Sequence, residues 1–445
     1  MVIERIALVN PNRWKPKTAP LGLEYLSSAL ESQGFAVDLL DLCHASDVGK
    51  TIRSFFSEHR PDLVGITHRN LDDVLYGRFM VPELRDIIRQ VRDATDAPMV
   101  LGGSGFSICP EQVLNSCRLD LGIAGEGEFA LPMLARNFGN LEAYKEVPGL
   151  VYRVGSEFRR NPVGMGDITG MRFSARSKVD DSRYVHKSGL KGATGVQTKR
   201  GCAQDCIYCV VPAVEGRVMR LHPVADIVDE IESVMAKGVR RFFFCDSEFN
   251  YPEEHAIAVC QEIVDRNLGG KISWSVYTAP KPFSLELAKL MVEAGCKLAI
   301  FTIENANEEI LRCMRKDFTP DDVKRMARFS RDAGLKFSCS TMLGGPGETM
   351  STVLETLNLL KEARANAAFA DPPGLRIYPN TPLVDIVREE GFNKRNPNLH
   401  GRIEGNEDFF EPVYYLSAQM GVLATAIKGW RKLGLARQAI LAMLG

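Results

Sequence analysis

Long apolar runs are missing from this sequence of 445 residues. No window holds the roughly 18 uncharged apolar residues that a membrane span needs, so no membrane partner is expected. Net charge is nearly absent as well, at −1, which excludes a global field of the kind that recruits nucleic acid. The opening MVIERIALVN has no basic head and no small-residue cleavage site, so it does not read as a secretion signal. We therefore expect a cytoplasmic protein with neither a nucleic-acid nor a membrane partner.

The sequence also lacks the even set of closely spaced cysteines that is typical of a disulfide framework. Its eleven cysteines are an odd number and are spread over a long chain. In a reducing compartment this usage argues against a disulfide framework and favours metal or redox chemistry where thiols cluster. One such cluster is present. Cys202, Cys206 and Cys209 lie within RGCAQDCIYCVV, directly after a predicted strand.

Residues 1–140 alternate short apolar runs with helical patterns. The predicted strands are 5–10, 36–42, 62–68, 98–104 and 119–125, and Gly34 is expected to close the helix after the first of them. This order predicts an α/β, Rossmann-like, doubly wound parallel sheet with a ligand crevice beyond the carboxyl ends of its strands. The residues expected at that edge are Asn10, Thr67, Gly102, Gly103, Gly125 and Glu126. The glycines could simply make tight strand-to-helix turns, but several such turns at one edge favour a cofactor crevice.

Residues 141–192 break the alternation and predict a basic linker that contains a hairpin around Gly155. From Arg153 to Arg200 the chain has eleven Lys and Arg against four Asp and Glu. Two interpretations stay open. A solvated linker explains most runs of this kind, whereas the sharper hypothesis is an anionic substrate held beside the cluster.

The alternation resumes over residues 193–391. Six strands are predicted, at 193–199, 240–247, 272–279, 297–304, 336–343 and 374–379, each followed by a helical stretch. Thr319 and Pro320 mark one helix start as N-cap and first helical residue, and Gly391 is expected to close the last helix. A second parallel α/β unit follows from this pattern. Residues 392–445 are expected to form a small helical C-terminal region, with a helix at about 416–437.

The three clustered cysteines suit one kind of site better than two others. Zinc would need a fourth ligand, and His222 or Cys245 lies far outside the usual spacing. A thioredoxin-like pair of Cys206 and Cys209 would leave Cys202 idle, and Pro212 would interrupt its helix. An iron-sulfur cluster accepts thiolates at these gaps, and three protein ligands leave one iron open. The open iron is a place for a small molecule to coordinate.

The segment GCAQDCIYC, after the first strand of a six-fold βα unit, resembles the signature of the radical S-adenosylmethionine (SAM) superfamily. The resemblance implies a partial (β/α)6 barrel in which Cys202, Cys206 and Cys209 hold a [4Fe-4S] cluster whose open iron binds SAM. It further implies reductive cleavage of SAM to a 5′-deoxyadenosyl radical. An electron donor such as a flavodoxin or ferredoxin is then an expected partner.

Later segments resemble the SAM-binding parts of the same family. CDSEF stands where the family has a Gly-Gly-Glu segment, without its glycines, and implies that Ser247 and Glu248 contact the SAM amino group. IFTIEN implies that Glu304 binds the SAM ribose, although a strand-end glutamate paired with a lysine is the plainer alternative. TMLGGPGET places Gly344 and Gly345 against the adenine. Tyr208 stacks near the adenine or belongs to the core.

The N-terminal part, with LVNPNRW, GGSGFSICPE and AGEGE, resembles the cobalamin-binding domain fused to many radical SAM enzymes. Together the two resemblances cover residues 1 to about 390. One departure matters, because the Asp-x-His-x-x-Gly motif is missing and His44 follows the second strand instead. The resemblance therefore implies cobalamin bound without a histidine ligand in the usual place.

Three functions follow from these patterns. The leading one is a cobalamin-dependent radical SAM methyltransferase that acts on an unactivated carbon of a small metabolite. The alternative is a cobalamin-independent radical cyclisation or rearrangement of an anionic, phosphorylated or nucleotide metabolite, with the N-terminal domain as scaffold. The third is a sensor or electron carrier, which does not need the nucleotide pocket that Glu304 and the fifth-strand glycines imply. Selectivity lies in pocket shape, so the sequence does not identify the substrate.

Overall fold

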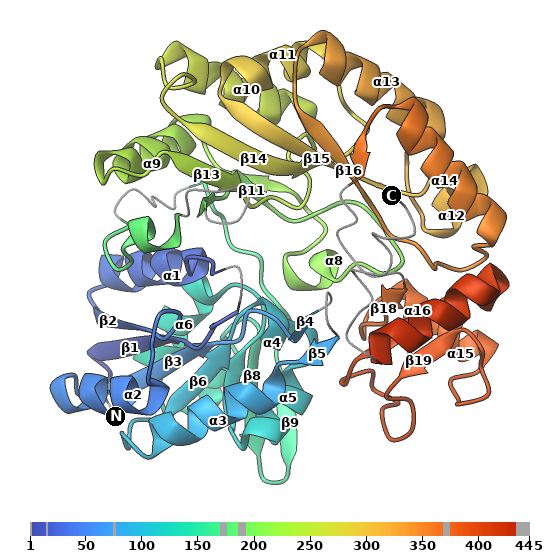
Figure 1. The fold of residues 1–445 in the computed structure, drawn as a ribbon. Helices are drawn as coiled ribbons and strands as arrows, with labels where there is room; N and C mark the ends of the chain where they lie inside the picture. Colours follow the sequence, from blue (N-terminus) through green and yellow to red (C-terminus); the bar gives the residue numbers. More distant parts are fainter. Residues whose placement is uncertain are drawn as a thin grey trace.

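Two α/β lobes and a small C-terminal unit make up the structure (Figure 1). The computed structural model describes residues 2–14, 17–73, 77–169, 176–185, 193–367 and 374–432. In Figure 1 the N-terminal lobe lies beneath the curved second sheet, and the short helix α8 (Val211–Val214) lies between them. Across these ranges, the helices all fall short of the length and apolar character required to cross a membrane.

The N-terminal sheet has seven strands in the order β2-β1-β3-β6-β7-β8-β9. Its strands are β1 (Arg5–Asn10), β2 (Ala36–Asp41), β3 (Leu63–Thr67), β6 (Met99–Gly102), β7 (Leu121–Ile123), β8 (Leu150–Val154) and β9 (Glu157–Arg160). The strands from β2 to β7 run parallel to one another, whereas β8 and β9 are antiparallel. This order confirms the doubly wound sheet and places its switch point, where ligands bind in such folds, between β1 and β3.

Helices cover both faces of this sheet. One face carries α1 (Leu21–Ser32) and α6 (Gly127–Arg136), and the other carries α2 (Val48–Glu58), α3 (Val81–Arg92) and α5 (Pro110–Cys117). Leu23 and Leu30 of α1 pack with Leu131 and Leu134 of α6, because apolar residues at helical spacing share one face. Gly34 follows the end of α1 with a φ of 89°, as predicted. Short connections complete the lobe, namely α4 (Ser104–Ile108), α7 (Leu141–Tyr144) and the ribbon of β4 (Asp72–Asp73) and β5 (Arg78–Phe79).

The predicted hairpin forms, but it belongs to the first sheet and not to a linker. β8 pairs with β7, with Leu121 opposite Tyr152, and β9 continues the sheet from there. The reason is burial, since Leu150 and Val151 are fully buried and Tyr152 is 4% exposed. The boundary of the first domain is therefore better proposed after Arg160 than at residue 140.

The basic excess of residues 153–200 is largely paired. Arg153 contacts Asp120 at 2.6 Å, Lys178 contacts Glu31 at 2.5 Å, and Arg200 contacts Glu128 at 2.6 Å. Arg176 is buried against Glu230 and Asp181. Arg172, Lys187 and Lys191 lie outside the described residues. Most described members of the cluster thus face carboxylates of the protein, which weakens the hypothesis of an anionic substrate at this place.

The second sheet has six parallel strands in the order β10-β13-β14-β15-β16-β17. They are β10 (Thr194–Val196), β13 (Arg241–Phe244), β14 (Ser273–Thr278), β15 (Cys296–Glu304), β16 (Phe337–Thr341) and β17 (Asn366–Ala367). The helices are α9 (Val224–Ala236), α10 (Glu253–Asp265), α11 (Leu285–Glu293), α12 (Glu308–Cys313), α13 (Pro320–Asp332) and α14 (Met350–Glu362). Phe242, Trp274 and Phe301 are buried in their shared core. Thr319 caps α13 in a capping box with Asp322, which confirms the predicted start.

The sixth strand of this sheet is not the predicted one. Residues 374–379 were expected there, but β17 pairs with β16 in that place. β18 (Leu375–Arg376) instead pairs antiparallel with β20 (Val413–Tyr415). The apolar side chains after Gly374 pack into the C-terminal core with Val413 and Tyr415, while the two-residue β17 has no apolar run to reveal it.

The C-terminal region is mixed and not purely helical. It contains α15 (Pro382–Glu390), β19 (Leu399–Gly401), β20, a 3-10 turn at Ala418–Met420 and α16 (Val422–Lys432). Gly391 closes α15 with a φ of 94°, as predicted. The predicted helix at 416–437 is shorter at its start, and its residues 433–437 lie outside the described residues.

Candidate active site

The three cysteines lie on the segment that connects β11 (Lys199–Arg200) to its antiparallel partner β12 (Arg220–Leu221). Cys202 and Cys206 are each 8% exposed, and Cys209 is half-buried. The Cys202 amide donates to the Gly216 carbonyl at 3.1 Å, and the Cys209 amide donates to the Cys206 carbonyl at 3.2 Å. Gly201 has a φ of 89°, and a Cβ there would lie 2.3 Å from the Val218 carbonyl oxygen. The backbone therefore fixes where the loop begins.

Burial disfavours the charged form of all three thiols. Burial raises the pKa of Cys202 and Cys206, and it raises the pKa of Cys209 to about 12, with further increases from the other two sulfurs. In the described ranges, no three His, Cys, Asp or Glu side chains stand at the spacing of metal ligands. Cysteines bind a metal as thiolates, so a bound cluster would displace their protons. The donor set itself, three sulfurs at gaps of three and two residues, fits an iron-sulfur cluster with one open iron.

Glu304 lies beside this loop at the end of β15. The strand register shifts between Thr302 and Glu304, and Glu304 has a φ of 56°. The Tyr208 hydroxyl donates to Glu304 Oε1 at 2.7 Å, so this tyrosine anchors the predicted ribose-binding carboxylate. Its ring also packs at the edge of the C-terminal core, which agrees with the plainer of its two predicted roles.

Lys316 joins Glu304 to the cysteine loop. Its Nζ atom lies 3.5 Å from Glu304 Oε1 and 3.5 Å from Cys206 Sγ. Burial lowers the pKa of Lys316, but Glu304, Cys206 and Glu248 together hold it above its usual value. A permanent cation therefore stands beside one cysteine sulfur. The sequence did not reveal this residue, because 110 positions separate it from Cys206.

Glu248 is the second carboxylate at this end of the sheet. Its Oε1 atom accepts a hydrogen bond from the Thr302 hydroxyl at 2.7 Å. Its Oε2 atom is buried and accepts none from any residue that the structure describes. Burial raises the pKa of Glu248 to about 7. A buried acceptor of this kind fits a cationic amine, and Ser247 lies half-buried beside it.

The glycine-rich turn after β16 is held by its own glutamate. Glu348 accepts hydrogen bonds from the amides of Gly344 and Gly345, the latter at 3.2 Å, and from Asn305 Nδ2 at 2.5 Å. A Cβ at Gly345 would lie 2.4 Å from Met314 Cε. The turn is thus tightly packed from one side, and its contact with adenine remains a prediction.

Glu348 should also make the stability of the protein depend on pH. Burial raises its pKa to about 7, although the hydrogen bonds from Gly344, Asn305 and Gly345 oppose the shift. The folded state therefore binds a proton more tightly than the unfolded state between about pH 4.5 and about pH 7, so stability falls as the pH rises through this interval. The expected size is about 3 kcal/mol, at roughly 1.4 kcal/mol for each unit of pKa.

Urea unfolding of the wild type and of Glu348→Gln at about pH 4.5 and about pH 8 measures this effect. The variant should show a smaller loss of stability between the two conditions. Glu355→Gln, which removes an exposed carboxylate from the following helix α14, is the control and should keep the wild-type difference. An identical pH difference in Glu348→Gln and wild type would contradict the assignment.

A cavity of about 540 Å³ opens at the carboxyl edge of the N-terminal sheet. It is lined by all six residues predicted for this edge: Asn10, Thr67, Gly102, Gly103, Gly125 and Glu126. The second lobe contributes its other wall through Gly195, Gln197, Arg200 and Cys245. No histidine lines it among the described residues, and His44 instead contacts Lys17.

At Gly103, with a φ of 101°, a Cβ would lie 2.6 Å from Thr67 Oγ1 and 2.8 Å from the His68 carbonyl oxygen. The missing side chain lets this turn pack against the end of β3 at the cavity wall, and the glycines and short side chains of this edge fit the close approach of a large cofactor such as a corrin.

Glu126 lies at the predicted edge, and its carboxylate is also paired within the protein. It lines the cavity, but its carboxylate is held by Arg220 at 2.7 Å and by Arg200 at 3.3 Å. Oε2 also accepts from the Gly166 amide at 3.0 Å. Its charge is therefore directed to the protein, and only its backbone and stem remain to face a cofactor.

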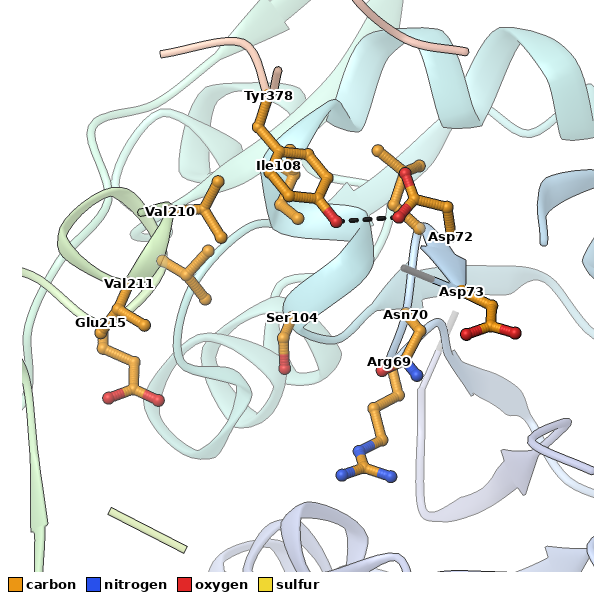
Figure 2. Close-up of a pocket in the computed structure, with 12 residues that line it drawn as sticks. Arg69, Asn70, Asp72, Asp73, Ser104, Ile108, Val210, Val211, Glu215 and Tyr378 are labelled. Atoms are coloured by element: carbon orange, nitrogen blue, oxygen red, sulfur yellow. Dashed lines mark hydrogen bonds between the residues drawn. The ribbon is translucent and has the colours of Figure 1, made fainter. Parts of the chain in front are cut away.

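A second cavity of about 370 Å³ adjoins the first (Figure 2). The two share Arg69, Asn70, Ser104, Val214 and Glu215 in their walls. Its apolar lining comes from Leu71, Ile108, Val210, Val211 and Tyr378. Figure 2 shows Tyr378 pointing to Asp72, which accepts its hydroxyl hydrogen bond at 2.8 Å and also binds Arg376 Nε at 2.7 Å. The sequence missed this cavity, because its walls come from the N-terminal lobe, from the segment around α8 and from the residue that follows β18 in the C-terminal unit.

Models of two protein families match the chain. The model of the radical SAM superfamily matches residues 196–360, and that of the B12 binding domain matches residues 13–135. Among curated proteins, tryptophan 2-C-methyltransferase of Streptomyces laurentii is 30% identical over 453 residues, which cover 86% of this chain and 74% of the relative.

Solved structures match over nearly the whole length. TsrM from Kitasatospora setae, a radical S-adenosylmethionine methyltransferase with cobalamin and a [4Fe-4S] cluster bound, superposes with a TM-score of 0.80 at 29% identity and covers 94% of this chain and 85% of its own. The same protein with tryptophan substrate and a SAM analogue gives a TM-score of 0.81. OxsB, a cobalamin-dependent S-adenosylmethionine radical enzyme, shares the fold with a TM-score of 0.77 at 17% identity, over 97% of this chain and 67% of its own.

Proposed function

Because the chain belongs to the radical SAM superfamily, within its cobalamin-dependent methyltransferase family, we propose that it transfers a methyl group from SAM to an unactivated carbon of a small metabolite. The cofactors would be a [4Fe-4S] cluster on Cys202, Cys206 and Cys209, and cobalamin in the cavity of about 540 Å³. When bound, the cluster supplies an electron for the cleavage of SAM and cobalamin carries the methyl group. An electron donor such as a flavodoxin or ferredoxin would reduce the cluster.

One observation carries this proposal. The cavity at the carboxyl edge of the N-terminal sheet is closed on its far side by the second sheet, through Gly195 and Cys245. Arg200, which also lines the cavity, comes two residues before Cys202. If the N-terminal domain served only as a scaffold, the carboxyl edge of its sheet would not need to face the cysteine loop. Group transfer between two cofactors requires such a shared chamber, because reacting atoms must come within roughly 3 to 3.5 Å.

The protein's own groups have separate tasks in this scheme. Glu248, with one buried oxygen that no described residue engages, would bind the SAM amino group, and Glu304 would bind the ribose from its place between Tyr208 and Lys316. Gly344 and Gly345 would leave room for the adenine. Asn10, Thr67, Gly102, Gly103 and Gly125 would contact cobalamin through short side chains and backbone.

We place the substrate in the cavity of about 370 Å³ beside the cobalamin site. Its apolar walls suit a flat, largely apolar molecule, and the Arg69 side chain stands where the two cavities meet. The related structure with tryptophan makes tryptophan and its derivatives the first compounds to test. The cyclisation alternative loses its main support, because the basic segment of residues 153–200 is largely paired with carboxylates.

Anaerobic reconstitution with iron, sulfide and cobalamin, followed by SAM, a reductant and candidate substrates, tests the function. We expect transfer of a labelled methyl group from SAM to carbon, with S-adenosylhomocysteine and deoxyadenosine as the other products. Deoxyadenosine with no methylated product and no S-adenosylhomocysteine, across all candidate substrates, would support the cyclase alternative instead.

Replacing Ile108 with phenylalanine tests the substrate position. The larger ring enters the cavity of about 370 Å³ from α4 of the N-terminal lobe. We expect a loss of methylated product of roughly tenfold or more, since pockets discriminate strongly against excess volume. Iron and cobalamin contents should stay at wild-type values. Ile108→Val, which removes one methylene, is the control and should stay close to wild type. Full activity in Ile108→Phe would place the substrate elsewhere.

A further inference from the structure

A buried cluster of four charged side chains joins the two lobes directly behind the cysteine loop. Arg200 Nη2 lies 2.6 Å from Glu128 Oε1, and Arg200 Nη1 lies 3.3 Å from Glu126 Oε1. Arg220 Nη1 lies 2.7 Å from the same Glu126 oxygen. We call Glu126, Glu128, Arg200 and Arg220 the interlobe clamp. The two glutamates belong to the N-terminal lobe, and the two arginines belong to the ribbon of β11 and β12.

The clamp is almost wholly removed from solvent. The side chains of Arg200 and Glu128 are each 7% exposed, that of Glu126 is 6% exposed and that of Arg220 is 13% exposed. Buried ion pairs contribute little net stability, because desolvation offsets their attraction, and they are better explained by the geometry that they specify. The charges in this cluster balance, at two of each sign. Breaking one contact would leave a buried charge without its partner.

Both ends of the clamp lie at cofactor positions. Glu126 and Glu128 line the cavity of about 540 Å³, where they follow β7 and begin α6. Arg200 pairs with Arg220 across the ribbon and precedes Cys202 by two residues. The ribbon is tied to the start of the cysteine loop by further bonds, since the Gly201 amide donates to Glu215 Oε2 at 3.2 Å and Arg220 Nη2 donates to the Glu215 carbonyl at 2.9 Å.

A third segment is held by the same groups. The Gly166 amide donates to Glu126 Oε2 at 3.0 Å, and Arg220 Nη1 donates to the Gly166 carbonyl at 3.0 Å. Arg200 Nε donates to Gln197 Oε1 at 2.8 Å, which ties the clamp to the residue after β10. The clamp therefore connects the cobalamin cavity, the segment between the lobes and the strand that leads to the cysteines.

We propose that Glu126, Glu128, Arg200 and Arg220 are positioning residues that fix the cluster-binding loop at a set distance from the cobalamin cavity. The expected effect of the interlobe clamp on catalysis rests on the proposed function. The geometric part does not, because it concerns contacts within the protein alone. Loosening the clamp lets the loop and the cavity move relative to each other. Steps that need both cofactors should then suffer more than steps that need only the cluster.

The test compares Glu128→Gln and Glu126→Gln/Glu128→Gln with wild type. Glutamine keeps the shape of glutamate and removes the charge. As a matched control, Asp229→Asn/Glu232→Gln removes two carboxylates from Arg266 on the outer helices, at 2.6 Å and 2.9 Å from its guanidinium. Glu128→Gln alone keeps Glu126 on both arginines, so it provides a folded variant if the double substitution does not fold.

The first measurement is hydrogen exchange of the metal-free protein, read by mass spectrometry. We expect peptides covering residues 199–206 and 163–168 to exchange about tenfold faster or more in the clamp variants, with the barrel core unchanged. The control should match wild type in these peptides. Unchanged exchange in both clamp variants would overturn the proposal, whatever reaction the protein catalyses.

The second measurement is made on reconstituted enzyme with equal iron and cobalamin contents. We expect the ratio of deoxyadenosine to methylated product to rise by roughly tenfold in the clamp variants, with the KM for SAM unchanged. A merely structural role would lower both products together with the folded fraction and leave the ratio constant, which would contradict the proposal. Absence of methylated product in wild type would refute the proposed function, and hydrogen exchange would still decide on the clamp.

Discussion

Cys206→Ala should remove SAM turnover altogether while the protein stays folded. Cys206 is 8% exposed, and its loss would take one ligand from the proposed set of three, which already leaves one iron open. Mutation of a residue that only hydrogen-bonds to a metal ligand typically lowers metal affinity or activity by about 10- to 100-fold. Removal of a ligand itself should therefore lower deoxyadenosine formation by more than about 100-fold. Iron per chain after anaerobic reconstitution and deoxyadenosine by chromatography are the two measurements.

Cys260→Ala is the control for this substitution. Cys260 is fully buried in the core of the second lobe, so alanine removes a thiol of similar burial without touching the loop. Each substitution should cost about 1 kcal/mol of stability through a small cavity. Retention of iron and of SAM cleavage in Cys206→Ala would remove the basis of the cluster assignment.

Gly103→Ala is expected to have the second-largest effect, on cobalamin binding and on stability together. A Cβ at this position would lie 2.6 Å from Thr67 Oγ1, 2.8 Å from the His68 carbonyl oxygen and 3.0 Å from the His68 amide nitrogen. Gly103 also has a φ of 101° and a ψ of 168°, a conformation that is essentially restricted to glycine. Strain and collision together should lower the free energy of unfolding by about 3 kcal/mol or more and displace β3 from the cavity wall.

Urea unfolding of the metal-free protein and cobalamin retained after gel filtration measure the two effects. Gly139→Ala is the matched control, because Gly139 lies in the same lobe with a φ of 87° and no atom within 4 Å of its Cβ position. It separates backbone strain from collision and should leave cobalamin retention unchanged. Wild-type cobalamin binding by a folded Gly103→Ala protein would exclude this edge as the cofactor site.

Local patterns predicted much of the fold because they reflect local causes. The capping box at Thr319 needs only four consecutive residues, and the helix end at Gly391 needs one glycine with a left-handed φ. The edge residues Asn10, Thr67, Gly102 and Gly125 were predicted together because the carboxyl ends of parallel strands meet at one edge. The strand at 374–379 was assigned to the wrong sheet, because an apolar run predicts that a strand is buried but does not indicate in which core.

The sequence by itself determined the order of the strands and helices, the three thiols at fixed spacing and the glycine-rich edge, because each of these depends on neighbours in the chain. Only the tertiary structure decided what those groups contact. It placed Lys316 beside Cys206 and paired the Glu126 carboxylate with Arg200 and Arg220. It also formed a second cavity between Ile108 of the N-terminal lobe and Tyr378, which follows β18 of the C-terminal unit. Such contacts join residues that lie tens to hundreds of positions apart. They depend on the packing of whole lobes, which no local pattern encodes.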